Sequence, residues 1–469
     1  MTKPSPRAFQ ALLIKIAVLV GVSSLTALLL FMADFSTEQA LSTSVLLAAI
    51  LGTLLFWEAR LSVVFVGVSL LLLSRTLRLD QMILYSSVDV IVFLVGMMIL
   101  TAAVDELGLF SWLVYLVIHQ KRNSGRMIIL QLCVISAILS CVIGEVSSII
   151  VMIAIIFQLC NHVKVNPIPF VIMSVMCTNI GSAGTMLGNP IGILIGLRAG
   201  LTFEDFILNA FPITIGLLVI TMLILFLWYR KPIKEFDTKL KEYLLEESAG
   251  TCTLPAPRLS LKAVLVFIIP LCLIALHYRL EKLLDLQKNT ILVAVPLVFA
   301  GIVLLWRRER AQDYVEKCVH WSTMLFFLFL FVLSGMLGST GVAQKIASFI
   351  IKLAGQEPIV ILGLLLITSG VLSAFLDNVV AIATFIPVVS SLESAGVNVS
   401  PLWWALLFGG CLGGNITMIG STANIVALGT LEKSQNLSVR FFDWLKIGLF
   451  VGIVTILLSG VGILLLSSR

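Results

Sequence analysis

An interrupted apolar segment that occurs twice constrains this chain more than any other feature. Each copy contains a short polar break inside an apolar run, Ser140-Cys-Val-Ile-Gly-Glu-Val146 in the first and Ser373-Ala-Phe-Leu-Asp-Asn-Val379 in the second. About 40 residues after each of these comes a Gly-rich break, at 179–190 and at 413–424. Backbone that leaves the helix at membrane depth must be buried in protein or line a watery cavity.

The two copies keep a nearly constant spacing. Gly144 and Asp377 are 233 residues apart, and Thr185 and Thr417 are 232 residues apart. The chain therefore contains a duplicated unit. Interrupted hydrophobic segments at matching places in two halves point to the substrate and ion site of a secondary transporter.

The composition indicates a membrane protein. Hydrophobic residues make up 59% of the chain and charged residues 12%, with a mean hydropathy of +1.11, whereas soluble domains carry about a quarter charged residues. The formal charge of +6 comes from basic residues that cluster in loops between apolar runs, which is typical of membrane topology and predicts no nucleic-acid partner. We predict an all-α polytopic membrane protein surrounded by the lipid bilayer.

Apolar runs, charged loops and the two copies divide the chain into five parts. The charged stretch between the copies is too polar to lie in lipid and is predicted to be a cytoplasmic linker. The predicted parts are N-terminal transmembrane helices at 1–87, transport repeat 1 at 88–229, the linker at 230–260, connecting transmembrane helices at 261–320 and transport repeat 2 at 321–469.

The basic residues also predict an orientation, because Lys and Arg are enriched in cytoplasmic loops. Lys3 and Arg7 place the N-terminus in the cytoplasm, whereas the loop at 392–400 has no basic residue and is placed outside. The second repeat then runs opposite to the first. We predict about 11 transmembrane helices in inverted repeats, a C-terminus outside, and the bacterial inner (plasma) membrane as the location.

Each repeat is predicted to hold a re-entrant hairpin followed by a broken helix. The apolar arms on either side of Glu145 and of Asp377 are about 12–18 residues long, and a spanning helix needs about 20. The alternative is one long helix with a polar kink. The Gly-rich breaks fall inside predicted helices at 168–199 and 401–431.

Glu145 and Asp377 are the two acids predicted deep in the membrane. A charge at the bilayer centre costs roughly 2.5–3.5 kcal/mol on insertion scales, so such residues usually mark ion or proton paths. We expect a Na+ site near Glu145 and Asp377/Asn378, or a proton site, with Na+ or H+ as the coupling ion and no other cofactor. The alternative is a neutral carboxyl bonded to a neighbouring helix.

The Gly-rich breaks release backbone groups and carry hydroxyl and amide side chains. The half-helix that opens at Gly188-Asn-Pro190 could face an anion with its positive end, whereas carbonyls and hydroxyls could ligate a hard cation. Glycines that only pack helices are the alternative. The predicted substrate- and ion-binding residues are Gly144, Glu145, Ser147, Ser182, Thr185, Gly188, Asn189, Asp377, Asn378, Asn415, Thr417, Gly420, Ser421 and Asn424.

Other readings of the polar residues carry less weight. Asp105-Glu106 is matched by Gly338-Ser339 in the second repeat, so we interpret the two acids as a solvated break outside the duplicated site. The intramembrane segments contain neither a nucleophile–base pair nor a metal cluster, which argues against an enzyme. A channel would use a similar polar lining, but matched hairpins favour alternating access.

At these residues the chain resembles the ion transporter superfamily. The nearest branch is the ArsB/NhaD-type permeases, which include arsenite and silicate exporters, sodium–proton antiporters and the melanosomal P protein, and the wider superfamily contains citrate transporter-like carriers. Ser373-Ala-Phe-Leu-Asp-Asn-Val379 resembles that branch's hairpin motif, and 179–190 its broken-helix motif. The resemblance implies a scaffold with a transport domain, a homodimer and elevator-type motion. It implies ion-site roles at the hairpin tips for Glu145, Asp377 and Asn378, and broken-helix roles for Thr185, Asn189, Thr417 and Asn424.

Two departures from the resemblance shape the functional hypothesis. Gly144-Glu145 stands where the branch commonly has Asp-Asn, so this tip is expected to hold an altered cation site or a proton site. Val146 and Val379 replace threonines of the dicarboxylate carriers, which disfavours a di- or tricarboxylate substrate. We expect an H+- or Na+-coupled anion or oxyanion permease that acts on a small inorganic or organic ion. The alternative is a Na+/H+ antiporter.

Overall fold

The computed structural model describes residues 6–56, 59–110, 112, 124–247, 261–355 and 357–467, and every regular element within them is a helix. The chain forms two compact units. Each unit combines segments that lie far apart in the sequence, so neither unit coincides with one repeat. The exclusively helical elements of the described residues confirm the predicted all-α class. The sequence also predicts a short amphipathic helix at 109–119, most of which lies outside the described residues.

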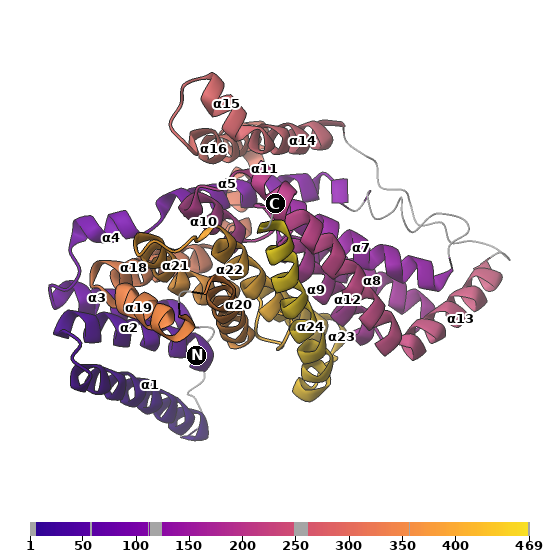
Figure 1. The fold of residues 1–469 in the computed structure, drawn as a ribbon. Helices are drawn as coiled ribbons and strands as arrows, with labels where there is room; N and C mark the ends of the chain where they lie inside the picture. Colours follow the sequence, from indigo (N-terminus) through magenta and orange to yellow (C-terminus); the bar gives the residue numbers. More distant parts are fainter. Residues whose placement is uncertain are drawn as a thin grey trace. The chain divides into compact units, whose positions relative to one another are not determined.

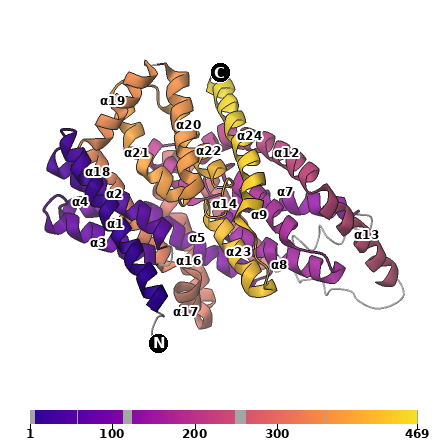
Figure 2. The same ribbon diagram turned by 90° about the horizontal axis from the view of Figure 1, so that it is seen from below.

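The first unit comprises Met1–Ile91, His320–Ile361 and Val379–Val399. Helix α1 packs on α2 and α2 packs on α3, and the three lie side by side in both views (Figures 1 and 2). Helix α18 packs across α2, α3 and α4. The helices of this unit are α1 (Pro6–Met32), α2 (Thr37–Leu55), α3 (Arg60–Leu73), α4 (Leu79–Tyr85), α18 (Trp321–Ser339), α19 (Val342–Ala354) and, except for its first residue, α21 (Asn378–Ser394).

The second unit comprises Val92–Val319, Leu362–Asn378 and Ser400–Arg469, and it contains both Gly-rich breaks. Helix α7 packs against α8 and α9, and α24 packs along α22 and α12 (Figure 1). Its elements, the first of which starts in the first unit, are α5 (Val88–Glu106), α7 (Gly125–Ile143), α8 (Glu145–Val163), α9 (Ile168–Ser182), α10 (Pro190–Ala199), α11 (Phe203–Asp205), the π-helix η2 (Phe206–Ala210), α12 (Phe211–Trp228), α13 (Arg230–Glu247), α14 (Leu261–Ala275), α15 (His277–Leu283), α16 (Thr290–Trp306), the 3-10 turn η3 (Arg308–Arg310), α17 (Ala311–Asp313), the π-helix η4 (Tyr314–Cys318), most of α20 (Pro358–Phe375), α22 (Ser400–Gly413), α23 (Thr422–Gln435) and α24 (Phe441–Ser467).

The number of apolar helices agrees with the predicted topology. Within the described ranges, nine helices are long and apolar enough to cross a membrane, and the number rises to 11 if each of two bent pairs is one span. The bends measure 67° between α14 and α15 and 101° between α16 and the segment Arg308–Cys318. The protein is therefore a polytopic membrane protein.

The predicted breaks are confirmed, and the predicted arm length of about 12–18 residues is met by the second helix pair but exceeded by the first. Helices α7 and α8 have 19 residues each, α20 has 18 and α21 has 17. The first pair is longer than predicted because Ser124 caps α7 ahead of the apolar run and α8 continues to Lys164, which adopts the left-handed conformation. At 1.5 Å per residue, a 19-residue helix is about 28 Å long, close to the bilayer's hydrocarbon thickness. Arm length therefore does not distinguish a re-entrant hairpin from two crossings.

The predicted linker is helical as far as Glu247, and this helix, α13, supports the end of the α7–α8 pair remote from its tip. Its apolar side buries Phe236, which contacts the ring of Phe170 at 5.4 Å between centroids. Asp237 accepts a hydrogen bond of 2.6 Å from the backbone N–H of Gly125, the first residue of α7. The Lys241 ammonium, 2.9 Å from the Asp237 carboxyl, and this N–H hold the pKa of that carboxyl below its ordinary value.

Asp237→Asn is expected to lower stability by roughly 0.5 kcal/mol at neutral pH, because a negative charge at a helix N-terminus is stabilising. Since the folded state lowers the pKa, the contribution of the charge is present above the unfolded-chain value and is lost as the pH falls through the folded value. Thermal unfolding of both proteins in detergent at several pH values measures this. Glu235→Gln, an exposed change on the same helix, is the control, and a difference between wild type and Asp237→Asn that persists in strong acid contradicts the role of the charge.

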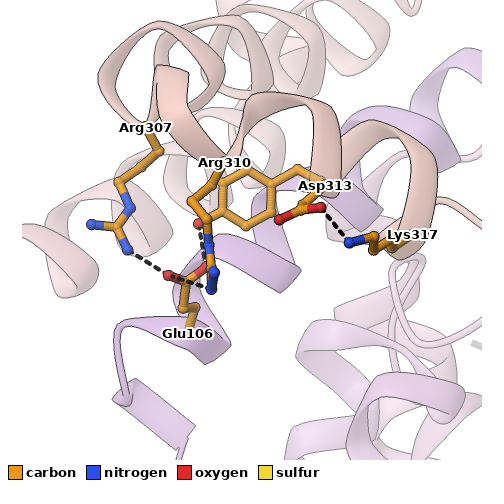
Figure 3. A network of polar contacts seen from close by, with 6 residues as sticks. Glu106, Arg307, Arg310, Asp313 and Lys317 are labelled. Atoms are coloured by element: carbon orange, nitrogen blue, oxygen red, sulfur yellow. Dashed lines mark hydrogen bonds and ion pairs between the residues drawn. The ribbon is translucent and has the colours of Figure 1, made fainter.

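Helix α5 ends at Glu106, at the predicted solvated break, and this residue also forms a polar network (Figure 3). Its Oε1 lies 2.5 Å from Arg307 and 3.4 Å from Arg310, and its Oε2 accepts a 2.7 Å hydrogen bond from the Tyr314 hydroxyl. These partners follow α16 by one to eight residues, where the chain bends. Sequence comparison of the repeats missed them because they are about 200 residues away. The network holds the end of α5 to this bend.

Glu106→Gln is expected to destabilise the protein by about 1 kcal/mol, because it weakens hydrogen bonds to charged groups at a partly exposed position. Asp313→Asn serves as the matched control, since Asp313 pairs at 2.6 Å with Lys317, whose side chain is 72% exposed. Thermal unfolding in detergent should separate the two variants. Equal melting temperatures would show that the Glu106 network does not stabilise this bend.

Candidate functional site

The tip of the first helix pair is fixed to the first broken helix. Gly144 lies between α7 and α8 with φ of 86° and ψ of 157°, a conformation that glycine adopts readily and other residues rarely. The next residue, Glu145, donates its backbone N–H to the carbonyl oxygen of Gly188 at 3.0 Å. The predicted break between α9 and α10 therefore lies directly against the predicted tip.

The same threonine contact occurs in both repeats. Thr185 Oγ1 donates to the carbonyl oxygen of Cys141, and Thr417 Oγ1 donates to that of Ala374. Each hydroxyl also accepts a hydrogen bond from the backbone N–H two residues further along, at 3.2 and 3.3 Å. Donors and acceptors match at the spacing found in the sequence, so the duplication is structural as well. Both threonines join a broken helix to the arm that precedes a tip.

Close backbone approach accompanies these hydrogen bonds. A Cβ atom at Gly181 would overlap the carbonyl oxygen of Ala137, and one at Gly413 would overlap that of Gly370. The four residues again correspond between the repeats. Interiors this tightly packed do not absorb an added methyl group without movement of the backbone.

An amide network joins the two repeats at their breaks. Asn179, near the end of α9, donates from Nδ2 to Asn415 Oδ1 at 2.9 Å and to Asn424 Oδ1 at 2.8 Å. Its own Oδ1 accepts a 3.1 Å hydrogen bond from Ser421 Oγ. All four side chains are buried. The network brings three of the predicted site residues together around Asn179, which was not predicted.

A second bond between the repeats corresponds to the first. Asn189 Nδ2 lies 2.8 Å from Cys411 Sγ and 3.0 Å from Ser182 Oγ. Asn179 matches Cys411 at an offset of 232 residues, and Asn189 matches Ser421 at the same offset, so the 179–421 and 189–411 bonds are equivalent. Asn179 and Cys411 were not predicted as site residues, although a polar side chain or a thiol inside an apolar run was an available signal for each.

The two half-helices that open at the breaks are capped by predicted site residues. Asn189 Oδ1 accepts from the N–H of Gly192 at 2.7 Å, and Ser421 Oγ accepts from that of Ala423 at 3.1 Å. Side-chain caps of this kind satisfy N–H groups that a helix start leaves free. The positive ends of α10 and α23 therefore begin at the breaks, with one N–H group of each already bonded.

Both predicted acids are buried, and their partners differ. Asp377 is 1% exposed and its Oδ2 accepts a 2.5 Å hydrogen bond from Thr422 Oγ1. Glu145 is 5% exposed, and its Oε2 has no hydrogen-bond partner in the described part of the protein. The two carboxyls interact electrostatically, and the hydroxyls of Ser182 and Ser421 are the polar neighbours of Glu145. The structure thus brings the two tips and both breaks to one place within the second unit.

Asn378 fills the position in the second repeat that corresponds to Glu145. Its amide is oriented by its neighbours, so that Nδ2 donates to the carbonyl oxygens of Gly420 at 2.6 Å and Gly410 at 3.1 Å. Ser373 Oγ lies 2.6 Å from the same amide. In the first repeat, Ser140 corresponds to Ser373, and its buried Oγ has no partner among the described residues. At these equivalent positions, the side chains of Ser373 and Asn378 are hydrogen-bonded within the second repeat, whereas Ser140 Oγ and Glu145 Oε2 in the first repeat have no partner among the described residues.

The remaining predictions are not tested by these contacts. Ser147 lies half-buried in the first turn of α8 and forms no hydrogen bond with the network in the described part of the chain. No group of three or more His, Cys, Asp or Glu side chains that could hold a metal ion occurs among the described residues. The expected Na+ positions near Glu145 and Asp377/Asn378 stay predictions.

The family model described as Citrate transporter matches residues 53–409 and 291–468 of this chain. The chain belongs to the citrate transporter family. Like other members, it is a membrane transporter rather than an enzyme. Membership of this family confirms the predicted relation to the permeases of the ion transporter superfamily.

Several relatives are similar to this family member over most of its length. An uncharacterized transporter of Mycobacterium tuberculosis is 29% identical over 377 residues, which is 80% of this chain and 85% of that protein. The P protein of Homo sapiens is 27% identical over 431 residues, covering 77% of this chain and 51% of that protein. The crystal structure of the Alcanivorax borkumensis YdaH transporter aligns with a TM-score of 0.48 at 18% identity, over 79% of this chain and 84% of that one.

Gly413→Ala is expected to destabilise this citrate transporter family member by about 2 kcal/mol, because the added methyl group overlaps backbone that cannot rotate away. Gly429→Ala in α23 is the matched control, since no atom lies within 4 Å of its Cβ position. Purified yield and thermal unfolding in detergent measure the effect. Similar melting temperatures for the two variants would contradict close packing at Gly413.

Proposed function

We propose that the protein is an ion-coupled secondary active transporter, an H+- or Na+-coupled anion or oxyanion permease that works by elevator-type alternating access. The observation that carries the proposal is the buried carboxyl of Glu145, whose Oε2 has no partner among the described residues, beside Asp377 and the two broken helices. Ionisable groups in membrane segments usually mark ion or proton paths. Discontinuous helices at matching places in two repeats form such sites in secondary transporters.

An anion is the substrate that the helix starts favour. Helices α10 and α23 both open at the breaks, and each N-terminus carries about half a positive charge. A Na+/H+ antiporter must bind both a sodium ion and a proton, and only two acids, Glu145 and Asp377, are predicted deep in the membrane to bind them. Val146 and Val379 lack the hydroxyls of the dicarboxylate carriers, so inorganic anions and oxyanions come before citrate-like substrates in this proposal. The family description alone names no substrate of this chain.

Na+/H+ antiport is the second candidate. It is favoured by the electrostatic contact between Glu145 and Asp377, because two neighbouring carboxyls that do not ionise together can exchange a proton for a metal cation. The proposal also includes a homodimer in the bacterial inner membrane with a cytoplasmic N-terminus. The dimer follows from the resemblance stated above, and the orientation follows from the distribution of basic residues.

Asp377→Asn is expected to reduce transport to the background of vesicles that lack the protein, because it removes a charge at the centre of the site while keeping the side-chain shape. Everted vesicles with a proton gradient and an internal pH-sensitive dye measure this on addition of Na+ or Li+. A panel of sulfate, silicate, arsenite and a dicarboxylate tests uptake and efflux of anions. Asp285→Asn, at an exposed position, is the control.

The outcomes separate the two candidates. Collapse of the gradient by Na+ or Li+ in the wild type and not in Asp377→Asn supports antiport. Movement of one anion that depends on the gradient and on Asp377 supports the permease. Transport by Asp377→Asn at the wild-type rate, with equal amounts of protein in the membrane, overturns the assignment of the site.

A further inference from the structure

We infer that α15 and the turn after α10 form a latch that holds the half-helix α10 in the described conformation and opens in each transport cycle, with Lys288 as its positioning residue. The latch consists of two contacts, that of Lys288 with Gly200 and that of Arg279 with Glu204. All four residues belong to the second unit. The inference rests on the proposed function, since it names a contact that alternating access has to break.

Helix α10 reaches from the first break to the latch. Asn189 caps its first turn at the break, and Gly200 follows its last residue with a φ of 67°, in the left-handed region. The residues from Ile191 to Gly196 are buried, whereas the four that follow are partly buried or exposed. A helix of ten residues is about 15 Å long. A constraint on its last turn therefore acts on the position of its first turn at the break.

Lys288 binds the C-terminal end of this helix. Its Nζ atom donates a 2.9 Å hydrogen bond to the carbonyl oxygen of Gly200. A helix C-terminus carries about half a negative charge, so a cation there is favourable. The ammonium group lies where a side chain at position 200 would begin, 2.4 Å from an added Cβ atom. Glycine at this position therefore provides both the left-handed conformation and the space for Lys288.

The turn after α10 makes the second contact. Arg279 Nε of α15 lies 2.7 Å from Glu204 Oε1 of α11. The backbone N–H of Thr202 donates to Asp205 Oδ2 at 2.7 Å, and the N–H of Asp205 donates to Thr202 Oγ1 at 3.2 Å. These two bonds fix the short turn from which Glu204 extends. Helix α11 packs on α14 beside this ion pair (Figure 1).

On the other side of the latch, a buried carboxyl fixes the loop that carries Lys288. Glu281 of α15 is 4% exposed, and its carboxyl accepts hydrogen bonds from the backbone N–H groups of Asn289 at 2.9 Å and Ile291 at 2.8 Å. Hydrogen bonds to a charged group are strong. They connect α15 to the first turn of α16 and fix the residue directly after Lys288. We therefore expect α15 and the start of α16 to move as one piece.

The latch is weak, which is the property that a contact needs if it opens repeatedly. The side chains of Arg279 and Glu204 are 69% and 38% exposed, and exposed ion pairs contribute little because water and salt screen them. At the other end of α10, Asn189 bonds to the buried Ser182 hydroxyl, and a Cβ atom at Gly188 would overlap the carbonyl oxygen of Ser182. A movement of α10 would therefore separate the latch before it disrupts the break.

Hydrogen exchange of the purified protein in lipid tests the positioning role without transport. Lys288→Met should raise the exchange rate of the backbone amides at 197–203 several-fold, because the end of α10 loses its partner. Lys288→Arg keeps a charged donor and should keep the wild-type rate. Lys282→Met is the matched control, since Lys282 is an exposed residue of the same helix, α15. Equal exchange rates in Lys288→Met and Lys282→Met overturn the role of Lys288.

A removable cross-link tests the opening of the latch. Glu204→Cys and Arg279→Cys are combined in one protein and joined by butanediyl bismethanethiosulfonate, a linker that a reductant removes. Transport should fall to the background of vesicles that lack the protein, and the reductant should restore it. Each single variant treated with the same reagent is the control, because it carries the label without the link. The background has serine at Cys252, Cys272 and Cys318, and the five other cysteines are buried.

The outcomes distinguish failure of the inference from failure of the proposed function. Full transport by protein whose link between positions 204 and 279 is verified by peptide mass spectrometry overturns the opening and leaves the proposed function standing. If no tested ion moves through the wild type, the proposed function is wrong and the opening falls with it, whereas the exchange rates still decide whether Lys288 holds α10. Loss of transport with the linker and recovery with the reductant support both.

Discussion

Backbone that leaves the helical path inside a membrane protein must find hydrogen-bond partners within the protein. This requirement organises the second unit. Thr185 and Thr417 each bond to the carbonyl oxygen of an arm residue near a tip, and amides and serines cap the half-helices that follow. The arms, tips and breaks consequently assemble around one polar centre. Within this centre, the Oε2 atom of Glu145 and the Oγ atom of Ser140 remain without a hydrogen-bond partner among the described residues.

The duplication is close in its backbone contacts and unequal in its chemistry. Glycines, threonines and the carbonyls they contact correspond at 232 or 233 residues. The tip side chains do not, since Glu145 corresponds to Asn378 and Gly144 to Asp377. An amide can close its position with protein acceptors, whereas a carboxyl needs a proton, a cation or donors. Divergence at the tips therefore converts a symmetric scaffold into one that holds two acids with different partners.

Much of this arrangement could be predicted from the sequence. The spacing of the glycine-rich stretches, of the threonines and of the tip residues predicts the breaks and their pairing, because polar side chains inside a membrane are costly unless they belong to a polar site. The arms of the first pair are longer than predicted because these helices extend past their apolar residues to ends set by Ser124 and Lys164. Asn179 carried a local signal, a polar side chain inside an apolar run, but its partners and those of Glu106 lie about 200 or more residues away, and hydrogen bonds at that separation leave no local pattern.

The bonds between the repeats also bear on the order of events during synthesis. The partners of Asn179 lie 236 to 245 residues further along the chain. At translation rates of about 5–20 residues per second, they emerge on the order of tens of seconds after Asn179 itself. Throughout that interval the Asn179 side chain lacks the partners from the second repeat to which it is bonded in the folded protein. The newly made first half is therefore an incomplete structure that needs another source of hydrogen bonds until the second half arrives.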